Sequence, residues 1–187
     1  ITASYGGDTN NAPSNSDVLS QVVNPASTTT TLKSSLNPSP FGSLVTFTAT
    51  VAGVNPTGTV TFRDGATDLG TGTVSGGQAS YMTNNLSVGT HSITATYGGD
   101  SNNAPSESTV LAQVVSKVST STAVTSSLNP STFGSSVTLT ATVTGSSPTG
   151  TVTFKDAGTE LGTGDLNGSG EATYMTSTLS VGTHNIT

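Results

Sequence analysis

The stretch Val45-Thr46-Phe47-Thr48-Ala49-Thr50-Val51 alternates strictly between apolar residues and threonines. Successive side chains of an extended strand point to opposite faces. This period of two therefore predicts a strand with its apolar residues buried and its threonines in water. Residues 60–62 and 91–97 show the same alternation, and no stretch shows a sustained helical period. The sequence thus predicts an all-β fold.

Turn residues divide the chain into short segments. Pairs of Gly, Asn, Asp and Pro stand between the alternating stretches, as in Asn37-Pro38, Asp64-Gly65 and Gly76-Gly77, and such pairs favour turns. Weaker strands are predicted near residues 30–34, 69–74, 79–83 and 110–115. The total of about seven strands, spaced about 8–14 residues apart, is typical of an immunoglobulin-like β-sandwich.

The sequence repeats itself with an offset of 92 residues, which becomes 93 after one inserted residue near Gly168–Gly170. PTGTVTFRD from Pro56 recurs as PTGTVTFKD from Pro148, and YMTNNLSVGTHSIT from Tyr81 recurs as YMTSTLSVGTHNIT from Tyr174. About two thirds of the aligned positions are identical. A period of this length suits one small sandwich per repeat and is too long for helical or propeller-blade repeats.

The repeat boundaries predict three domains or parts of domains. Residues 1–24, here called the N-terminal segment, match the C-terminal strands of a preceding repeat. Residues 25–116 form one complete repeat, the middle repeat. Residues 117–187 form the last repeat, which lacks the part that matches residues 95–115.

The part that the last repeat lacks is the part that residues 3–23 supply at the other end of the chain. Two interpretations fit this pattern. Either the chain is a slice of a longer continuous array, or residues 3–23 of one copy complete the last repeat of the next by strand addition, head to tail. In both, neighbouring copies of the repeat are the expected partners.

Composition excludes several classes of site. The 187 residues contain no Cys, which excludes a disulfide framework and Cys-ligated metal sites. Four Lys and Arg residues against ten Asp and Glu residues leave no basic footprint for nucleic acid. No apolar run approaches the roughly 20 residues that span a bilayer, so we expect no membrane insertion of this segment.

A family resemblance lies in the run LSVGTHSITATYGGD from Leu86, followed by NNAPSES and a valine-rich stretch. Together with PTGTVTFRDG from Pro56, it resembles the bacterial immunoglobulin-like repeats of large surface proteins. The resemblance covers nearly the whole chain. It implies a structural role as a stalk, spacer or filament, and an extracellular or cell-surface location.

The two histidines, His91 and His184, occupy the same position in the two repeats. A catalytic or metal-binding role needs a nucleophile, an acid or further ligands beside them. Neither has another His, a Cys or a carboxylate close in sequence. We therefore expect each to lie partly buried at the start of a strand, with its ring nitrogens bonded to the backbone.

Two similar loops offer oxygen atoms to a cation. Asp8 with Asn10, and Asp100 with Asn102, are weak calcium candidates. Calcium takes six to eight oxygen ligands, usually with several carboxylates, whereas each loop has one. Because Asp and Asn also form tight turns by bonding their own backbone, a plain hairpin turn is the favoured interpretation.

Two pairs of acids flank a predicted hairpin turn, Asp64 with Asp68 and Asp156 with Glu160. Paired carboxylates perform glycoside hydrolysis when they flank a cleft. Here they would lie on a turn, and the chain has no Trp that could stack on a sugar. Solvated turn acids are therefore expected, and with them no catalytic residues and no cofactor.

The sequence favours a structural protein that is not an enzyme. Sheet hydrogen bonds and a Val/Phe core would resist extension, and a Thr/Ser coat would face water. The alternative is an adhesin-type module that recognises a glycan or a protein through inter-strand loops. The candidate loops for that role are Gly98–Ser106 and Asp64–Leu69.

Overall fold

A computed structural model describes all 187 residues, Ile1–Thr187. Its regular elements are strands only, and it has no helix with the length and apolar character needed to span a bilayer. Its contacts divide the chain into two compact units. One comprises Ile1–Ser39, Leu44–Asn84 and Gly89–Val114, and the other comprises Pro40–Ser43, Asn85–Val88 and Val115–Thr187.

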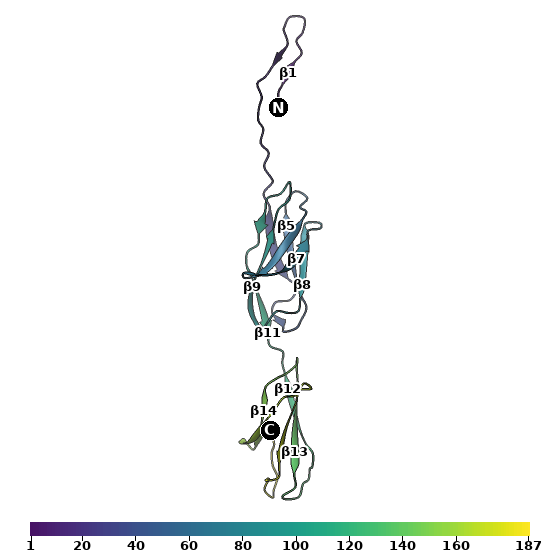
Figure 1. The fold of residues 1–187 in the computed structure, drawn as a ribbon, viewed down its shortest axis with the longest axis vertical. Coiled ribbons are helices and arrows are strands. Elements are labelled where there is room, and N and C mark those ends of the chain that lie inside the picture. The colour runs from purple at the N-terminus through teal and green to yellow at the C-terminus, as the bar shows by residue number, and fades with distance from the viewer. The chain divides into compact units, whose positions relative to one another are not determined.

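The middle repeat is built from two β-sheets (Figure 1). The first sheet has the order β3-β5-β8, with β3 at Thr29–Ser34, β5 at Val45–Ala52 and β8 at Gln78–Thr83. The second sheet has the order β4-β11-β9-β6-β7. These strands are β4 (Ser39–Pro40), β11 (Leu111–Ser116), β9 (Gly89–Tyr97), β6 (Thr59–Asp64) and β7 (Thr67–Thr73), and the short β10 (Ser106–Glu107) pairs with β9.

This arrangement confirms the predicted all-β sandwich. The seven predicted strands are present, and the structure adds two strands of two residues each, β4 and β10, which are too short to show a period. The apolar residues of β5 are buried as predicted. The prediction that its threonines face water is wrong for Thr46 and Thr48, which are half-buried, because β5 is the central strand and its neighbours flank them.

The core of the middle repeat lies between its two sheets. Its largest fully buried side chains include Phe47, Phe62, Ile93 and Tyr97. The Phe62 ring stacks on Tyr81 with 5.9 Å between ring centroids. A Cβ at Gly70 would lie 2.5 Å from the Tyr81 ring, so only glycine allows this packing.

The last repeat contains counterparts of β3, β5, β6, β7 and β8, but none of β4. A three-stranded sheet has the order β12-β13-β16, and β14 pairs with β15. The strands are β12 (Ser121–Ser126), β13 (Val137–Thr144), β14 (Thr151–Asp156), β15 (Thr159–Asp165) and β16 (Glu171–Thr176). Both hairpins carry the same register shift, after Phe62 in β6 and after Phe154 in β14.

The N-terminal segment contains one small hairpin. Strand β1 (Ser4–Tyr5) pairs antiparallel with β2 (Ser14–Asn15). The partners Tyr5 and Ser14 correspond to Tyr97 and Ser106, which are partners in the β9–β10 pair of the middle repeat. The local hairpin is therefore encoded within about twenty residues of sequence.

Candidate functional site

The site that recurs in both repeats is an Asp–His pair. Asp64 ends β6, His91 lies near the start of β9, and His91 Nδ1 is 2.6 Å from Asp64 Oδ2. In the last repeat His184 Nδ1 lies at the same 2.6 Å from Asp156 Oδ2. The other oxygen of Asp64 accepts the Ser92 N–H at 3.0 Å. Each carboxylate therefore holds one histidine ring and the backbone of the next residue.

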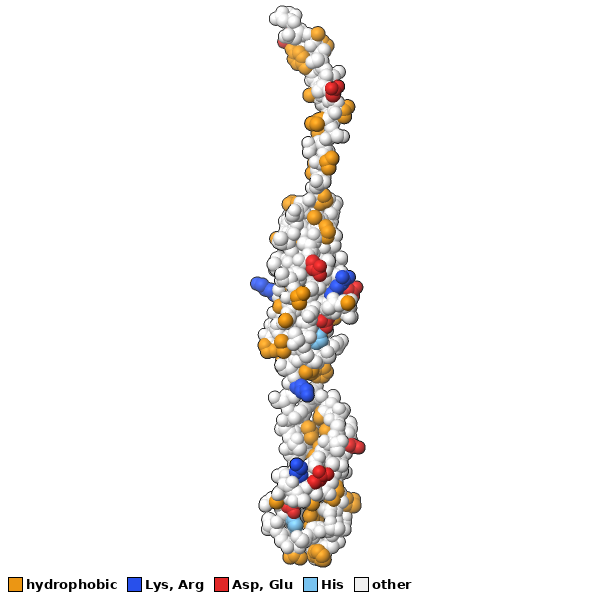
Figure 2. Space-filling model, turned by 90° about the vertical axis from the view of Figure 1, so that its left-hand side faces the viewer, with side chains coloured by type: hydrophobic (Ala, Val, Ile, Leu, Met, Phe, Trp, Pro, Cys, Tyr) orange, Lys and Arg blue, Asp and Glu red, His pale blue; other side chains and the backbone are white.

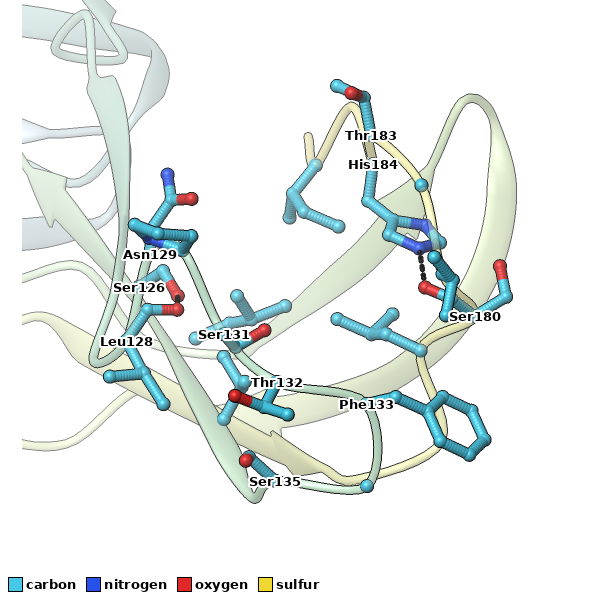
Figure 3. A pocket seen from close by; sticks show the side chains of 18 residues that line it. Ser126, Leu128, Asn129, Ser131, Thr132, Phe133, Ser135, Ser180, Thr183 and His184 are labelled. Atoms are coloured by element: carbon cyan, nitrogen blue, oxygen red, sulfur yellow. Dashed lines mark hydrogen bonds between the residues drawn. The ribbon is translucent and has the colours of Figure 1, made fainter.

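The prediction for these histidines is wrong in one respect. Their Nδ1 atoms contact a carboxylate and not the backbone. Sequence reasoning missed the partner because Asp64 precedes His91 by 27 residues and only the antiparallel pairing of β6 with β9 brings them together. For the other ring nitrogen the expectation holds in the last repeat, where His184 Nε2 is 2.9 Å from the Ser180 carbonyl oxygen (Figure 3).

The geometry of His184 favours its protonated form. Both ring nitrogens face acceptors, so both are well placed to carry a proton. The bond to Asp156, followed by the bond to Ser180, raises the pKa of His184 above its ordinary value. A histidine in this state has no free nitrogen to remove a proton from a nucleophile. The arrangement is a clasp between two chain segments.

The two acids of the middle-repeat hairpin have different partners. Asp64 contacts His91, whereas Asp68 accepts a 2.6 Å bond from Arg63 Nε. The Arg63 and Asp68 side chains are 46% and 63% exposed, so this ion pair contributes little to stability. Neither repeat gathers three or more acidic or histidine side chains into a group that could hold a metal ion.

Asp100 organises the loop that follows β9. Its Oδ1 accepts the backbone N–H groups of Asn102 and Asn103, and its Oδ2 accepts the Thr57 N–H and the Tyr97 hydroxyl. The bonds from Asn102 and Thr57 hold the pKa of Asp100 far below its ordinary value. Burial, together with Asp100, raises the pKa of Tyr97. The carboxylate therefore serves the loop itself.

The calcium candidates are arranged as turn residues. Asn102 meets Asp100 through its backbone N–H, and Asn10 meets Asp8 in the same way at 2.8 Å. The Asn10 backbone and the Tyr5 hydroxyl lower the pKa of Asp8 to about 2. In both loops the carboxylate accepts protein donors at the distances of ordinary hydrogen bonds.

Asn103 is a structural residue that sequence reasoning missed. It is 1% exposed, its Oδ1 accepts the Val54 N–H, and its Nδ2 donates to the Val54 carbonyl. These bonds join the loop after β5 to the loop after β9. Gly99 has φ +83°, and a Cβ there would lie 2.8 Å from the Asn103 carbonyl oxygen, so the tight loop requires glycine.

Gln113 is a second buried polar residue that was missed. It is fully buried in β11, where its Oε1 accepts the Ser34 hydroxyl at 2.6 Å and its Nε2 donates to the Leu36 carbonyl at 2.9 Å. The signal was present in the sequence, because Gln21 occupies the equivalent position in an otherwise apolar strand pattern. A buried amide is retained in such a position only when its bonds are satisfied.

The two loops proposed for ligand binding lie at opposite ends of the middle repeat. In the antiparallel pair, Asp64 lies opposite Ile93 near the start of β9, and Val60 lies opposite Tyr97 at its end. The loop Asp64–Leu69 therefore leaves one end of the sheet and Gly98–Ser106 leaves the other. They do not form a single binding surface.

Comparison with protein families gives one family model that matches two parts of the chain. The family model described as bacterial Ig-like domain (group 3) matches residues 30–116 and again residues 124–187. No curated protein matches the chain.

Three solved structures are similar to the chain. The fibronectin(III)-like modules of Clostridium thermocellum CbhA share 22% identity over 84% of this chain and 82% of theirs, with a TM-score of 0.39. The human OSCAR ligand-binding domain shares 15% over 79% and 81%, with a TM-score of 0.37. A chimeric titin Z1Z2, functionalized with a KLER exogenous peptide from decorin, shares 18% over 85% of each chain, with a TM-score of 0.34.

Proposed function

Because the chain belongs to the bacterial Ig-like domain family (group 3), we propose that it is an extracellular structural module whose repeated sandwiches act as a stalk or spacer. The family supports a structural or extracellular role in general terms. The more specific role rests on what the polar side chains do in this chain.

The observation that carries the proposal is that the polar side chains suited to chemistry bind the repeat's own chain. His184 is held by Asp156 and Ser180. Asp100 is held by its own loop and by Thr57, and Gln113 by Ser34 and Leu36. Groups used in this way stabilise a fold and give no support to catalysis.

The hydrogen bonding around β11 is suited to mechanical resistance. Asn37 Nδ2 donates to the Ala112 carbonyl, and further along both segments Phe41 N–H donates to the Ser116 carbonyl. Because residue numbers rise together in the two segments, they run parallel. A force that slides the two segments past each other loads these hydrogen bonds at the same time, so the bonds resist the force as a group.

The surface also fits a spacer. Figure 2 shows that uncharged polar side chains and backbone cover most of the visible face, with acidic and basic side chains scattered singly or in small groups. Only 7% of the residues are charged. Such a surface concentrates no charge that would attract a particular ligand.

The alternative, an adhesin-type module that binds a glycan or a protein, has weaker support. Its two candidate loops lie at opposite ends of the middle repeat. The carboxylate of the Gly98–Ser106 loop accepts bonds from within the repeat. No observation in the structure favours a ligand for either loop.

Single-molecule force spectroscopy tests the spacer function. When the chain is pulled from its two ends, the middle repeat is expected to unfold in one cooperative step that releases about 300 Å of chain. Asn37→Ala should lower the unfolding force, because it removes the bonds to Ala112 and Val114.

The matched control is Asn129→Ala, the same change at the equivalent position of the last repeat, which should leave the step of the middle repeat unchanged. Extension without a resolved step would contradict the proposal. So would an unfolding force that Asn37→Ala does not alter.

A further inference from the structure

The turn between β15 and β16 of the last repeat contains Asn167-Gly168, the only Asn-Gly pair in the chain. The backbone nitrogen that follows an asparagine can attack the side-chain carbonyl carbon, Cγ, and close a ring. Glycine at this place has no Cβ, so it leaves that nitrogen less hindered than any other residue does. The pair is therefore a candidate modification site, and the turn around it determines how readily it reacts.

The side-chain carbonyl of Asn167 is held by two backbone donors. Its Oδ1 accepts the Ser169 N–H at 2.9 Å and the Glu171 N–H at 3.0 Å. When a nucleophile attacks Cγ, this oxygen becomes an oxyanion. Two N–H groups that already bond the oxygen stabilise that charge in the same way as the oxyanion hole of an enzyme. The turn therefore favours attack on Asn167.

The second donor exists because of the residue inserted in this turn. In the middle repeat, Ser75 and Gln78 close the equivalent turn by exchanging two backbone bonds of 2.8 and 3.1 Å. In the longer turn of the last repeat, the Gly170 N–H makes the bond to the Asn167 carbonyl. The Glu171 N–H is thereby released from the backbone and bonds the Asn167 side chain instead. Only the longer turn provides both donors.

The nucleophile, the Gly168 nitrogen, is accessible. No hydrogen bond of the turn uses the Gly168 N–H, and the residue is exposed. The one Asp-Gly pair of the chain, Asp64-Gly65, differs in this respect. There the Gly65 N–H donates to the Ser92 carbonyl at 2.9 Å. Of the two pairs, only Asn167-Gly168 has an unbonded nitrogen next to its side-chain carbonyl.

The turn is also fixed in place before any reaction. Asn167 N–H donates to the Glu171 carbonyl at 2.8 Å, and Gly170 N–H donates to the Asn167 carbonyl at 3.0 Å. The Gly170 carbonyl in turn accepts the Val143 N–H of β13 at 2.8 Å. Donors held in this way need no reorganisation when charge develops on the oxygen, so their stabilisation of the oxyanion is not offset.

We propose that Asn167 is a self-modification site, at which the side-chain amide is converted to a carboxylate without an enzyme. Hydroxide removes the Gly168 N–H proton, and the nitrogen attacks Cγ of Asn167 to form a C–N bond. The Cγ–Nδ2 bond then breaks, and Nδ2 leaves as ammonia after it takes a proton from water, which regenerates hydroxide. The resulting cyclic imide adds one water molecule, which opens the ring at either carbonyl. One water is consumed and one ammonia is released, and no group is oxidised or reduced.

The two products differ in their effect on the turn. Opening at Cγ gives aspartate, whose carboxylate still accepts the Ser169 and Glu171 N–H groups, as Asp100 accepts two N–H groups of its own loop. Opening at the backbone carbonyl gives isoaspartate, in which the carbonyl that Gly170 bonds becomes a carboxylate and the chain runs through Cβ and Cγ. Either product adds one negative charge, which changes the formal net charge from −6 to −7. The middle repeat has Ser75 at this position and is not modified there.

The first test is mass spectrometry of peptides from the folded 187-residue chain after incubation over a range of mildly alkaline pH. We expect conversion at Asn167 and no comparable conversion at the other asparagines. The rate should rise about tenfold per pH unit, because each unit raises the hydroxide concentration by that factor and hydroxide removes the Gly168 proton.

Gly168→Ala is the matched variant. Gly168 does not have a positive φ, and a Cβ there meets nothing within 4 Å, so alanine leaves the turn and its hydrogen bonds intact. The added Cβ hinders the adjacent nitrogen, so the rate of conversion at Asn167 should fall by more than about tenfold. Circular dichroism checks that the variant keeps the native fold.

Two comparisons isolate the contribution of the turn. The chain unfolded in guanidinium chloride has the same Asn-Gly pair without the oriented donors, so it should react about tenfold more slowly than the folded chain, or more slowly still. Ser75→Asn places an Asn-Gly pair in the shorter turn of the middle repeat. There the Gln78 N–H bonds the backbone carbonyl of residue 75. The introduced asparagine should therefore react more slowly than Asn167 of the same chain.

Four outcomes overturn the inference. They are no conversion at Asn167, a rate that Gly168→Ala leaves unchanged, an unfolded chain that reacts as fast as the folded one, and equal rates at Asn167 and at the asparagine introduced by Ser75→Asn. The spacer function does not depend on any of them, because force spectroscopy tests it separately.

Discussion

The middle and last repeats have similar sequences but bury equivalent side chains to different extents. Ile93 is fully buried, whereas its counterpart Ile186 is half-buried. Val60 and Val152 differ in the same way. Both repeats form the same hairpins in the same register. The comparison shows that local sequence is sufficient for the hairpins, whereas burial depends on the strands that pack across the sandwich.

A second contrast is between two copies of one loop. Asp8 and Asp100 each accept two backbone N–H groups from the following turn. Asp100 also accepts the Thr57 N–H, and Asn103 binds Val54 on both sides of its amide. Asn11, the counterpart of Asn103, is exposed and bonds only within its own loop. The loop is the same, but only one copy joins separate parts of a sandwich.

The greatest difference in stability is expected between core substitutions in the two repeats. Phe62→Ala should lower the free energy of unfolding of the middle repeat by about 4 kcal/mol, because the side chain is fully buried among buried neighbours. Phe154→Ala should cost less, since the half-buried Val152 and Ile186 beside it are free to move into the space. Hydrogen-exchange mass spectrometry of the β6 and β14 amides measures both. Equal losses of unfolding free energy would contradict the claim that the two cores differ in packing.

A smaller effect is expected at the loop. Asn103→Ala should destabilise the middle repeat by about 2 kcal/mol, because it leaves the backbone groups of Val54 unpaired. Asn11→Ala removes the equivalent side chain and should leave the unfolding midpoint of the middle repeat unchanged. Chemical denaturation followed by circular dichroism compares the two variants. Equal destabilisation by both variants would contradict the claim that only Asn103 joins separate parts of the sandwich.

The smallest effect concerns pH in the last repeat. The bonds to Asp156 and Ser180 raise the folded-state pKa of His184, so the protonated ring stabilises the fold. This contribution is fully present below a pH of about 6.5, the ordinary pKa of histidine, and is lost as the pH rises through the raised pKa.

Hydrogen exchange at residues 179–187, corrected for its intrinsic pH dependence, should therefore show protection that declines above neutral pH. His184→Gln should remove that decline. A decline that persists in the variant would assign the effect to another group.

Much of the fold was predictable from residues that are near in sequence. The alternation in Val45–Val51 predicted β5, and the Asp64-Gly65 pair predicted the hairpin turn. The Asp64–His91 clasp was not predictable in this way, because its partners are 27 residues apart and meet only through the register of β6 with β9. The bonds from Asn103 to Val54 and from Gln113 to Ser34 and Leu36 were missed for the same reason, since they join residues 49 or more positions apart.

The alternating strands, the hairpin turns and the repeat could be read from local sequence, because each depends on side-chain alternation or turn preference over a few neighbouring residues. Tertiary structure decided which of these strands are covered and which polar side chains are satisfied. Those outcomes require segments that are distant in the sequence to lie side by side. Such segments cover Val60 and Ile93 of the middle repeat more completely than their counterparts Val152 and Ile186 of the last repeat.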